Sequence, residues 1–107
     1  MKNNKQETPK GFYDESNRII AEFMQLETAE FSPNNILNYK HGDAWFEEHE
    51  LSYDVSWDWL MPVAEKCLTT DEPSDGQHYF INDALLTCNI EVVYDRIVEF
   101  IKTYNDG

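Results

Sequence analysis

Residues 56–66 read SWDWLMPVAEK, and this stretch does most to decide the fold. Two tryptophans, a methionine and a proline stand together at the start of a segment whose later apolar residues recur at helical spacing. Ser56 or Asp58 is a suitable N-cap, and Pro62 then falls at or near the first turn, where its missing N–H costs little. The stretch therefore predicts a helix over about 57–69.

The two tryptophans of this helix cannot face the same way. Trp57 and Trp59 lie two positions apart, which is about 200° around a helix. We expect one of them to anchor the core and the other, with Trp45 or Tyr53, to be partly exposed beside acidic side chains. The alternative is that both belong to the core, on opposite sides of a sandwiched helix. Exposed aromatic side chains rimmed by carboxylates favour docking on an Arg- and Lys-rich partner.

The last helix has the most regular pattern in the chain. Its apolar residues follow one stripe at helical spacing and predict a helix over about 88–104: Ile90, Val93, Tyr94, Ile97, Val98, Ile101 and Tyr104. The outer face carries Glu91, Asp95 and Glu99, each four positions from the next. Like charges at this spacing destabilise a helix by a few tenths of a kcal/mol, roughly, per pair. Selection for stability alone would remove this ladder.

Two shorter segments predict strands. From His49 to Val55 apolar and polar residues alternate, which is typical of a half-buried strand over about 49–55. Residues 78–82, HYFIN, are aromatic and β-branched and predict a second strand that pairs with the first. Two strands alone are marginal, so helices must pack on them.

The remaining segments complete an α+β prediction. A broad apolar face predicts a first helix over about 14–27, followed by a loop from Ser32 through Gly42. Thr69–Gly76 predicts a second loop. Residues 1–10 are expected to form a flexible tail, and residues 11–107 a single acidic domain in which three helices pack on a small antiparallel sheet.

Charge is the extreme feature of the composition. The 107 residues hold 8 Lys and Arg against 21 Asp and Glu, a net charge of −13. Three of the bases and only one acid lie in residues 1–10, which leaves 5 bases and 20 acids on the rest of the chain. Such a surface repels nucleic-acid phosphate and anionic membranes, and it attracts a partner with a basic face. The alternative is that the acids only keep the protein soluble.

Catalytic and metal-binding patterns are weak. His41, His49 and His78 match no zinc spacing with the neighbouring glutamates, and no phosphate-binding glycine loop or nucleophile elbow is present. Cys67 and Cys88 are expected to be buried, reduced thiols. We predict no catalytic residues, cofactor or metal. No segment of the sequence is apolar for long enough to span a membrane, and a cytoplasmic protein is expected.

The motif at Ser56–Lys66 also carries a resemblance. Together with Tyr53 and with residues 89–105 it resembles a family of small proteins of bacteriophages and of bacterial genomes that contain phage-derived DNA. The similarity covers about the last half of the chain and Ile19–Leu26. The resemblance implies a phage or mobile-element origin, and it brings no activity, cofactor or catalytic residue with it.

Two hypotheses for function follow, from different classes. The first is a non-catalytic protein-interaction module, an acidic inhibitor or nucleic-acid mimic that occupies a basic groove. The second is a structural or accessory domain that forms homo-oligomers through exposed aromatic residues; a small-molecule enzyme comes third. The interaction surface predicted by the first hypothesis comprises Glu47, Glu48, Glu50, Asp54, Trp57, Asp58, Glu91, Asp95 and Glu99.

Overall fold

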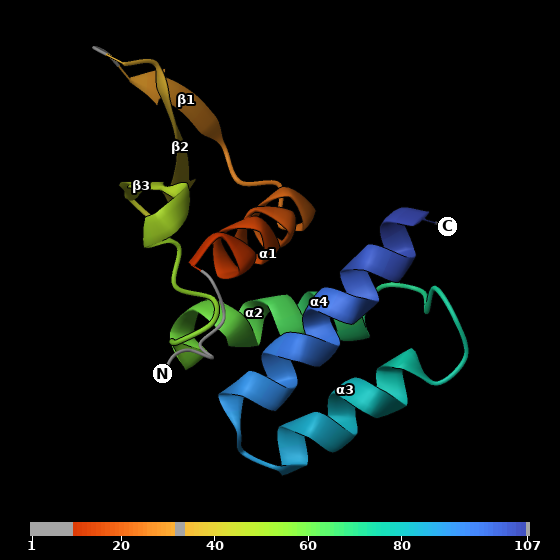
Figure 1. The fold of residues 1–107 in the computed structure, drawn as a ribbon. Coiled ribbons are helices and arrows are strands. Elements are labelled where there is room, and N and C mark those ends of the chain that lie inside the picture. Colours follow the sequence, from red (N-terminus) through yellow and green to blue (C-terminus); the bar gives the residue numbers. More distant parts are fainter. Residues whose placement is uncertain (1–9, 32–33, 107) are drawn as a thin grey trace, which may run out of the picture.

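The computed structural model describes residues 10–31 and 34–106 and has the predicted α+β class (Figure 1). This part of the chain contains four α-helices, one short 3-10 helix and one three-stranded sheet. In order they are α1 (Lys10–Phe23), β1 (Thr28–Phe31), β2 (Ile36–His41), β3 (Ala44–Glu47), η2 (Glu48–Glu50), α2 (Trp57–Leu68), α3 (Gln77–Leu86) and α4 (Ile90–Asp106).

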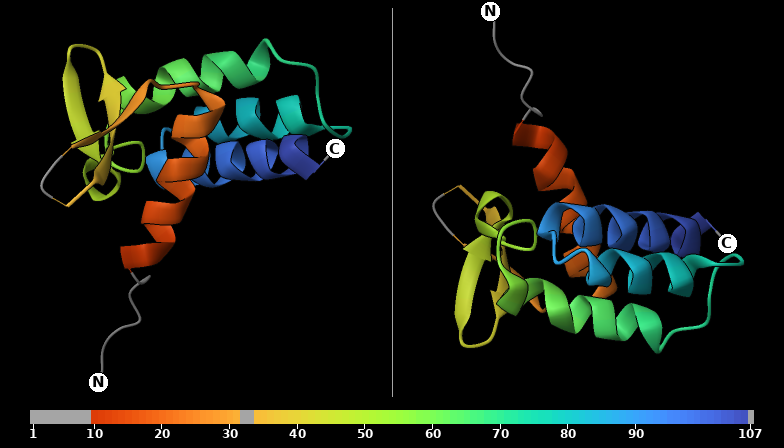
Figure 2. Two further views of the ribbon diagram at one scale, coloured as in Figure 1. Left: turned by 90° about the horizontal axis from the view of Figure 1, so that it is seen from above. Right: turned by 90° about the horizontal axis from the view of Figure 1, so that it is seen from below.

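The helices and the sheet occupy separate parts of the molecule. Helices α2, α3 and α4 run back and forth beside one another, and α1 crosses them (Figure 2). The sheet stands to one side, with the β1–β2 hairpin extending away from the helices (Figure 1). None of the helices in the described ranges is both long and apolar enough to cross a membrane.

The core forms where α4 meets the other helices, as its apolar stripe predicts. Val93, Ile97 and Ile101 have no exposed surface, and Phe100 adds a large buried ring that the predicted stripe did not include. Buried residues of the other three helices pack in the same cluster: Ile20, Ala21, Leu60, Val63, Ala64, Cys67, Ile81 and Ala84. Burial of this apolar surface is the main force that holds the helices together.

The sheet is an antiparallel meander, and it does not lie where the sequence predicts it. Its strand order is β1-β2-β3. The predicted loop through Gly42 is wrong, because residues 36–41 form the central strand. Gly42, with a φ of 65°, makes the tight turn into β3 that a residue with a side chain rarely makes. The turn before β2 likewise contains Asn35 in the left-handed region.

The predicted strand over 49–55 is also wrong. The carboxylate of Glu50 accepts a hydrogen bond from the Glu47 N–H, and this capping box closes the single turn η2 where a strand was expected. Further turns follow, and they still bury Leu51 and Tyr53. Of the residues on the predicted buried side, Leu51 and Tyr53 are buried, but His49 and Val55 are exposed. The alternation therefore predicts burial only in part, and the backbone is not extended.

The predicted strand over 78–82 belongs to helix α3. Its side chains separate by helical position: Ile81 is buried, whereas Tyr79 is 66% exposed. Gly76 starts the helix with a φ of 90°, a conformation that glycine adopts without strain. Packing of Ile81 and Ala84 against α4 outweighs the local β-preference of the aromatic residues. The described part of the chain consequently has four α-helices, one more than the three predicted.

The other predicted boundaries agree better. Helix α2 matches the predicted 57–69 with Ser56 as its N-cap, but Pro62 lies in the second turn instead of the first. Helix α4 begins and ends two residues later than the predicted 88–104, while α1 starts four residues before the predicted 14–27 and ends at Phe23. Lys10, the last residue of the predicted tail, already belongs to α1, and residues 1–9 lie outside the described ranges.

Candidate functional site

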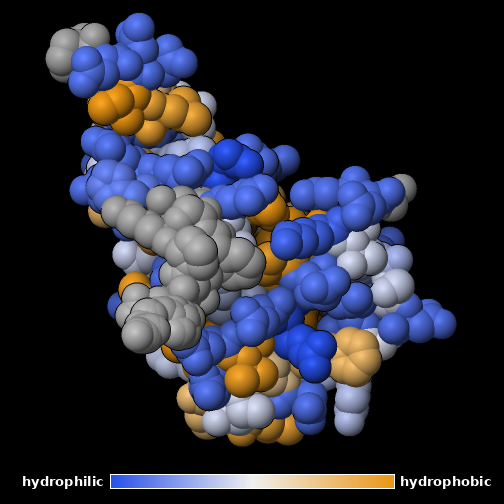
Figure 3. Space-filling model, in the orientation of Figure 1, coloured by the Kyte–Doolittle hydropathy of each residue, from blue (hydrophilic) through white to orange (hydrophobic). Residues whose placement is uncertain are grey.

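The carboxylate ladder of α4 lies on the outside of the molecule. Glu91, Asp95 and Glu99 are all exposed, because the opposite side of α4 is the one buried in the core. Hydrophilic side chains cover most of α4 in the view of Figure 3, and the apolar areas on that face of the molecule are small and separated. The three carboxylates are therefore accessible to a partner along this helix.

One end of the ladder faces a hollow that a distant loop completes. Asp54 and Val55, from the loop before α2, line a cavity of about 380 Å³ together with Glu91, Tyr94 and Asp95 of α4. We call this cavity the acidic hollow. Three of its five described lining residues are carboxylates, and two sections of chain nearly forty positions apart supply them. The fold thus gathers acids that the sequence only scatters.

A buried asparagine fixes the geometry of the acidic hollow. Asn17 of α1 is only 2% exposed, and its Nδ2 donates hydrogen bonds to the Leu51 carbonyl at 3.0 Å and to Asp54 Oδ1 at 3.1 Å. Its Oδ1 accepts a hydrogen bond from the Tyr94 hydroxyl at 2.9 Å. Asn17 therefore ties the loop that carries Asp54 to α4, so that the carboxylate is held in place before any partner arrives.

The carboxylates of the acidic hollow are not neutralised by a neighbouring cation. Burial and the nearby charge of Glu91 raise the pKa of Asp95, and Arg96 opposes this shift only in part. The Arg96 guanidinium lies over the Phe80 ring, 5.0 Å from its centroid. Among the described side chains, no Lys, Arg or His forms an ion pair with Asp54, Glu91 or Asp95. The five described residues that line the hollow therefore carry three negative charges and no positive one.

The acidic surface continues from the hollow along α4. Asp95 also lines two adjoining depressions, and Glu99 lines both of them. Lys102 borders one and Arg96 the other. The sequence prediction for α4 thus identifies three residues that the structure brings to one surface, together with Asp54 from the predicted set.

The other predicted site residues lie elsewhere or have local partners. Glu47 and Glu50 form the capping box of η2, and Glu47 also lies 3.5 Å from His49 Nδ1. Glu48 lies 3.8 Å from the Arg18 guanidinium. These pairs are largely solvated and contribute little to stability. Trp57 and Asp58 begin α2, and neither lines the acidic hollow.

One tryptophan of α2 packs against the core and the other is exposed, as the first of the two predictions states. Trp57 is 38% exposed, whereas Trp59 packs against the core and stacks on His41 with ring centroids 3.6 Å apart. Of the two aromatic residues expected beside the exposed tryptophan, Trp45 is partly exposed, whereas Tyr53 is only 1% exposed. The exposed aromatic beside acids is therefore Trp57, next to Asp58.

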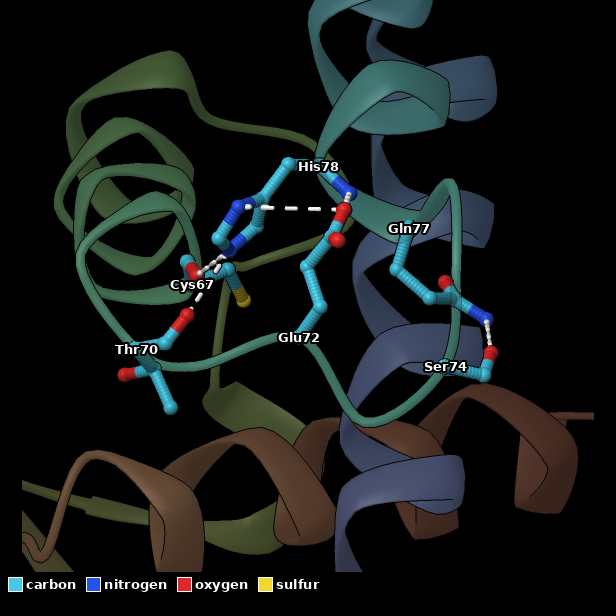
Figure 4. Close-up of polar contacts among 6 residues, drawn as sticks. All are labelled: Cys67, Thr70, Glu72, Ser74, Gln77 and His78. Carbon is cyan, nitrogen blue, oxygen red and sulfur yellow. Dashed lines mark hydrogen bonds and ion pairs between the residues drawn. The ribbon is translucent and has the colours of Figure 1, made fainter.

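His78 makes hydrogen bonds that join two helices. His78 Nε2 lies 3.0 Å from the Cys67 carbonyl and 2.7 Å from the Thr70 carbonyl, so this nitrogen carries the hydrogen and donates to both (Figure 4). Glu72 accepts a hydrogen bond from the His78 backbone N–H. The side chain thereby joins the end of α2 to the start of α3 and leaves no Nε2 lone pair for base catalysis.

The cysteines differ in exposure. Cys67 is fully buried as predicted, and burial raises the pKa of its thiol to about 12. The expectation of a second buried thiol is wrong, because Cys88 is exposed at the end of α3. In the described ranges no group of three or more His, Cys, Asp or Glu residues is arranged to hold a metal ion.

Comparisons with known proteins add no family to this picture. No family model matches the chain, and no curated protein and no solved structure matches it either. The phage-associated family implied by the Ser56–Lys66 motif stays a prediction, as does a cytoplasmic location. The candidate site therefore depends on the geometry alone.

Three residues that shape the acidic hollow could not be recognised from the sequence. Val55 falls in a predicted strand, Tyr94 in the predicted apolar stripe of the last helix, and Asn17 in the predicted first helix. A polar residue in the first turns of a helix is common, so Asn17 carries no signal of its long-range contacts. Only the fold reveals that it links α1, the loop at Asp54 and α4.

Proposed function

We propose that this protein is a non-catalytic interaction module that binds the basic face of a partner protein through the acidic hollow and the carboxylate ladder of α4. The observation that carries the proposal is the convergence of Asp54, Glu91 and Asp95 on one cavity, where none of them forms an ion pair with a described side chain. An arginine or lysine side chain of a partner supplies the missing positive charge.

The arrangement agrees better with a protein partner's basic patch than with full mimicry of DNA. The ladder repeats every four residues, so α4 presents about one carboxylate per 6 Å of helix axis. A DNA strand presents one phosphate per about 3.4 Å of axis. The α4 ladder therefore reaches roughly half the charge density of one strand. Asp54 adds to it at one end, which favours a compact basic site over a long nucleic-acid groove.

Binding of a labelled arginine-rich peptide tests the proposal. The triple variant Asp54→Asn/Glu91→Gln/Asp95→Asn removes the charges of the acidic hollow and is expected to weaken binding by about tenfold or more. Binding by the unmodified chain should also weaken between about 50 mM and 200 mM salt, because salt screens charges at a surface.

A second triple variant supplies the matched control. Glu27→Gln/Asp43→Asn/Asp71→Asn removes three exposed acids from other parts of the chain and leaves the same net charge as the first variant. The proposal requires that this control binds nearly as well as the unmodified protein. Equal weakening by both variants would show that overall charge, and not the acidic hollow, attracts the peptide.

Self-association through the sheet is a second candidate function. The strand register places Phe31, Ile36 and Trp45 on one face, and the Phe31 and Trp45 rings lie edge to face with centroids 5.3 Å apart. Phe31 is 41% and Ile36 39% exposed. Light scattering tests this candidate: it requires a mass that rises with protein concentration and that falls to the monomer's in Ile36→Gln. A monomer at every concentration excludes it.

A further inference from the structure

A second surface of the protein is apolar. Along the seam between α2 and α3 runs a groove of about 450 Å³, lined by Met61, Pro62, Ala64, Glu65 and Leu68 of α2 and by Leu85 of α3. Glu65 is its only charged lining residue in the described part of the chain. We call it the α2–α3 groove. It is distinct from the acidic hollow, with which it shares no lining residue.

The groove holds apolar surface that the fold leaves unfilled. Met61 is 44% exposed, and Leu68 and Leu85 are partly exposed although both touch the core. Single exposed apolar residues are ordinary on protein surfaces. A concave run of them contributed by two helices is not, and such a surface typically receives a partner's side chains.

Acidic residues flank these apolar positions on the same side of α2. Asp58, Met61, Glu65 and Leu68 follow one another at intervals of three, four and three residues, so they lie on one helix face. The apolar positions thus alternate with carboxylates along this face of α2, and Glu65 lines the groove itself. A partner that fills the groove binds most tightly when Lys or Arg residues flank its apolar side chains, because their charges complement the carboxylates.

We infer that the α2–α3 groove binds a basic amphipathic helix of the partner. A seam between two helices fits a third helix, whose apolar side chains at i, i+3 and i+4 enter it while its cations meet Asp58 and Glu65. The inference rests on the proposed function, since it assigns a secondary structure to the same basic partner. The groove supplies the apolar anchor, and the acidic hollow supplies the charge attraction.

Charge and composition disfavour two alternative occupants of the groove, a second copy of the chain and residues 1–9 of the chain itself. A second copy of the chain brings another net charge of −13, which opposes docking at a groove flanked by acids. Residues 1–9 of the chain itself have only Met1 and Pro9 as apolar side chains, so their sequence offers no apolar helix face. A basic partner helix has neither drawback.

The test compares two labelled peptides of identical leucine and lysine composition. In one, the leucines fall on a single helix face; in the other, the order is scrambled so that no apolar face forms. We expect the amphipathic peptide to bind at least about tenfold more tightly than the scrambled one, because only it can fill the groove. Met61→Gln should remove most of that difference.

The sheet offers a matched control for the groove variant. Leu37 of β2 is 42% exposed, close to the 44% of Met61, and it lies outside the groove. Leu37→Gln should therefore leave the preference for the amphipathic peptide intact. Equal loss in Leu37→Gln and Met61→Gln would overturn the inference, because the effect would then not depend on the groove. Circular dichroism and unfolding of both variants verify that each one folds.

The two proposals fail in different ways. If both peptides bind equally and the acidic-hollow triple variant weakens both, the proposed function holds and the groove inference is overturned. If the amphipathic peptide binds preferentially but the triple variant changes nothing, the groove binds a helix and the proposed function is overturned. A concentration-dependent mass that Met61→Gln abolishes would assign the groove to a second copy and overturn the choice of a basic helix.

Discussion

Replacing Asn17 with alanine tests the contact that builds the acidic hollow. The substitution removes three hydrogen bonds, to the Leu51 carbonyl, to Asp54 and from the Tyr94 hydroxyl. At about 1 kcal/mol each, the bonds contribute about 3 kcal/mol. Alanine recovers roughly 0.5 kcal/mol through its higher helix propensity. We therefore expect Asn17→Ala to lower the free energy of unfolding by about 2.5 kcal/mol.

Urea unfolding followed by tryptophan fluorescence measures this loss. For a domain of this size, about 2.5 kcal/mol corresponds to a fall in Tm of at least about 10 °C. Tyr94→Phe removes one of the three bonds and should cost about 1 kcal/mol. The double variant should show a coupling energy of similar size, since the two side chains share that bond.

An exposed asparagine provides the comparison. Asn82 lies on the outside of α3, and Asn82→Ala should leave stability unchanged or slightly raised. A loss below about 1 kcal/mol for Asn17→Ala, or a coupling energy near zero with Tyr94→Phe, would refute the reasoning. The network would then not hold Asp54 in place, and the acidic hollow would lack a fixed geometry.

Three further predictions concern titratable side chains. Asp95→Asn should raise stability by a few tenths of a kcal/mol, about the repulsion that it relieves at Glu91, while it weakens binding of the arginine-rich peptide. Burial lowers the pKa of His41, so the His41 imidazole binds a proton more readily in the unfolded chain than in the folded protein. The free energy of unfolding should therefore decrease as the pH falls below about 6.5, and it should decrease less steeply in His41→Gln. A thiol reagent should modify only Cys88 in the folded protein, because burial raises the pKa of the Cys67 thiol to about 12.

Each of these predictions has its own control. Asp71→Asn removes an exposed acid outside the hollow and should alter peptide binding far less than Asp95→Asn does. His49→Gln changes an exposed histidine, and a loss of pH dependence equal to that of His41→Gln would contradict the assignment to His41. Thiol modification that persists at the same rate in Cys88→Ala would show that Cys67 is accessible in the folded state.

Helices with a long apolar stripe could be predicted from the sequence. Helix α4 repeats its apolar residues over many turns, and α2 combines a good N-cap at Ser56 with a dense apolar start. The spacing of apolar residues in such a segment shows both the type of secondary structure and the residues that are buried, and it can be read from that segment alone. The same periodicity predicts that the three acids of the ladder share the outer face of α4, and all three are exposed.

The strands could not be predicted, because short segments depend on their tertiary surroundings. Residues 36–41 contain Asn38, Lys40 and His41, which give a half-polar strand the composition of a loop. Residues 78–82 have β-preferring side chains, but burial of Ile81 makes them helical. A run of five or six residues carries too weak a preference to outweigh such contacts.

The acidic hollow could not be predicted from the sequence, because it also depends on tertiary contacts. Asp54 meets Glu91 and Asp95 only because Asn17 bonds to residues 34 to 77 positions away. No local pattern encodes contacts at that separation. The sequence pattern predicts the exposed acids of α4. Of the other predicted acids, Glu47 and Glu50 form the capping box of η2, and Asp58 lies in the first turn of α2.

The most direct test of the account is a map of amide chemical shifts as the arginine-rich peptide is added to the protein. We expect the largest changes at Asp54 and Val55 and along α4 from Glu91 to Glu99, and we expect them to weaken as salt is raised. Changes spread evenly over all exposed acids, including Glu27 and Asp71, or none at all, would contradict the claim that the acidic hollow is a binding site.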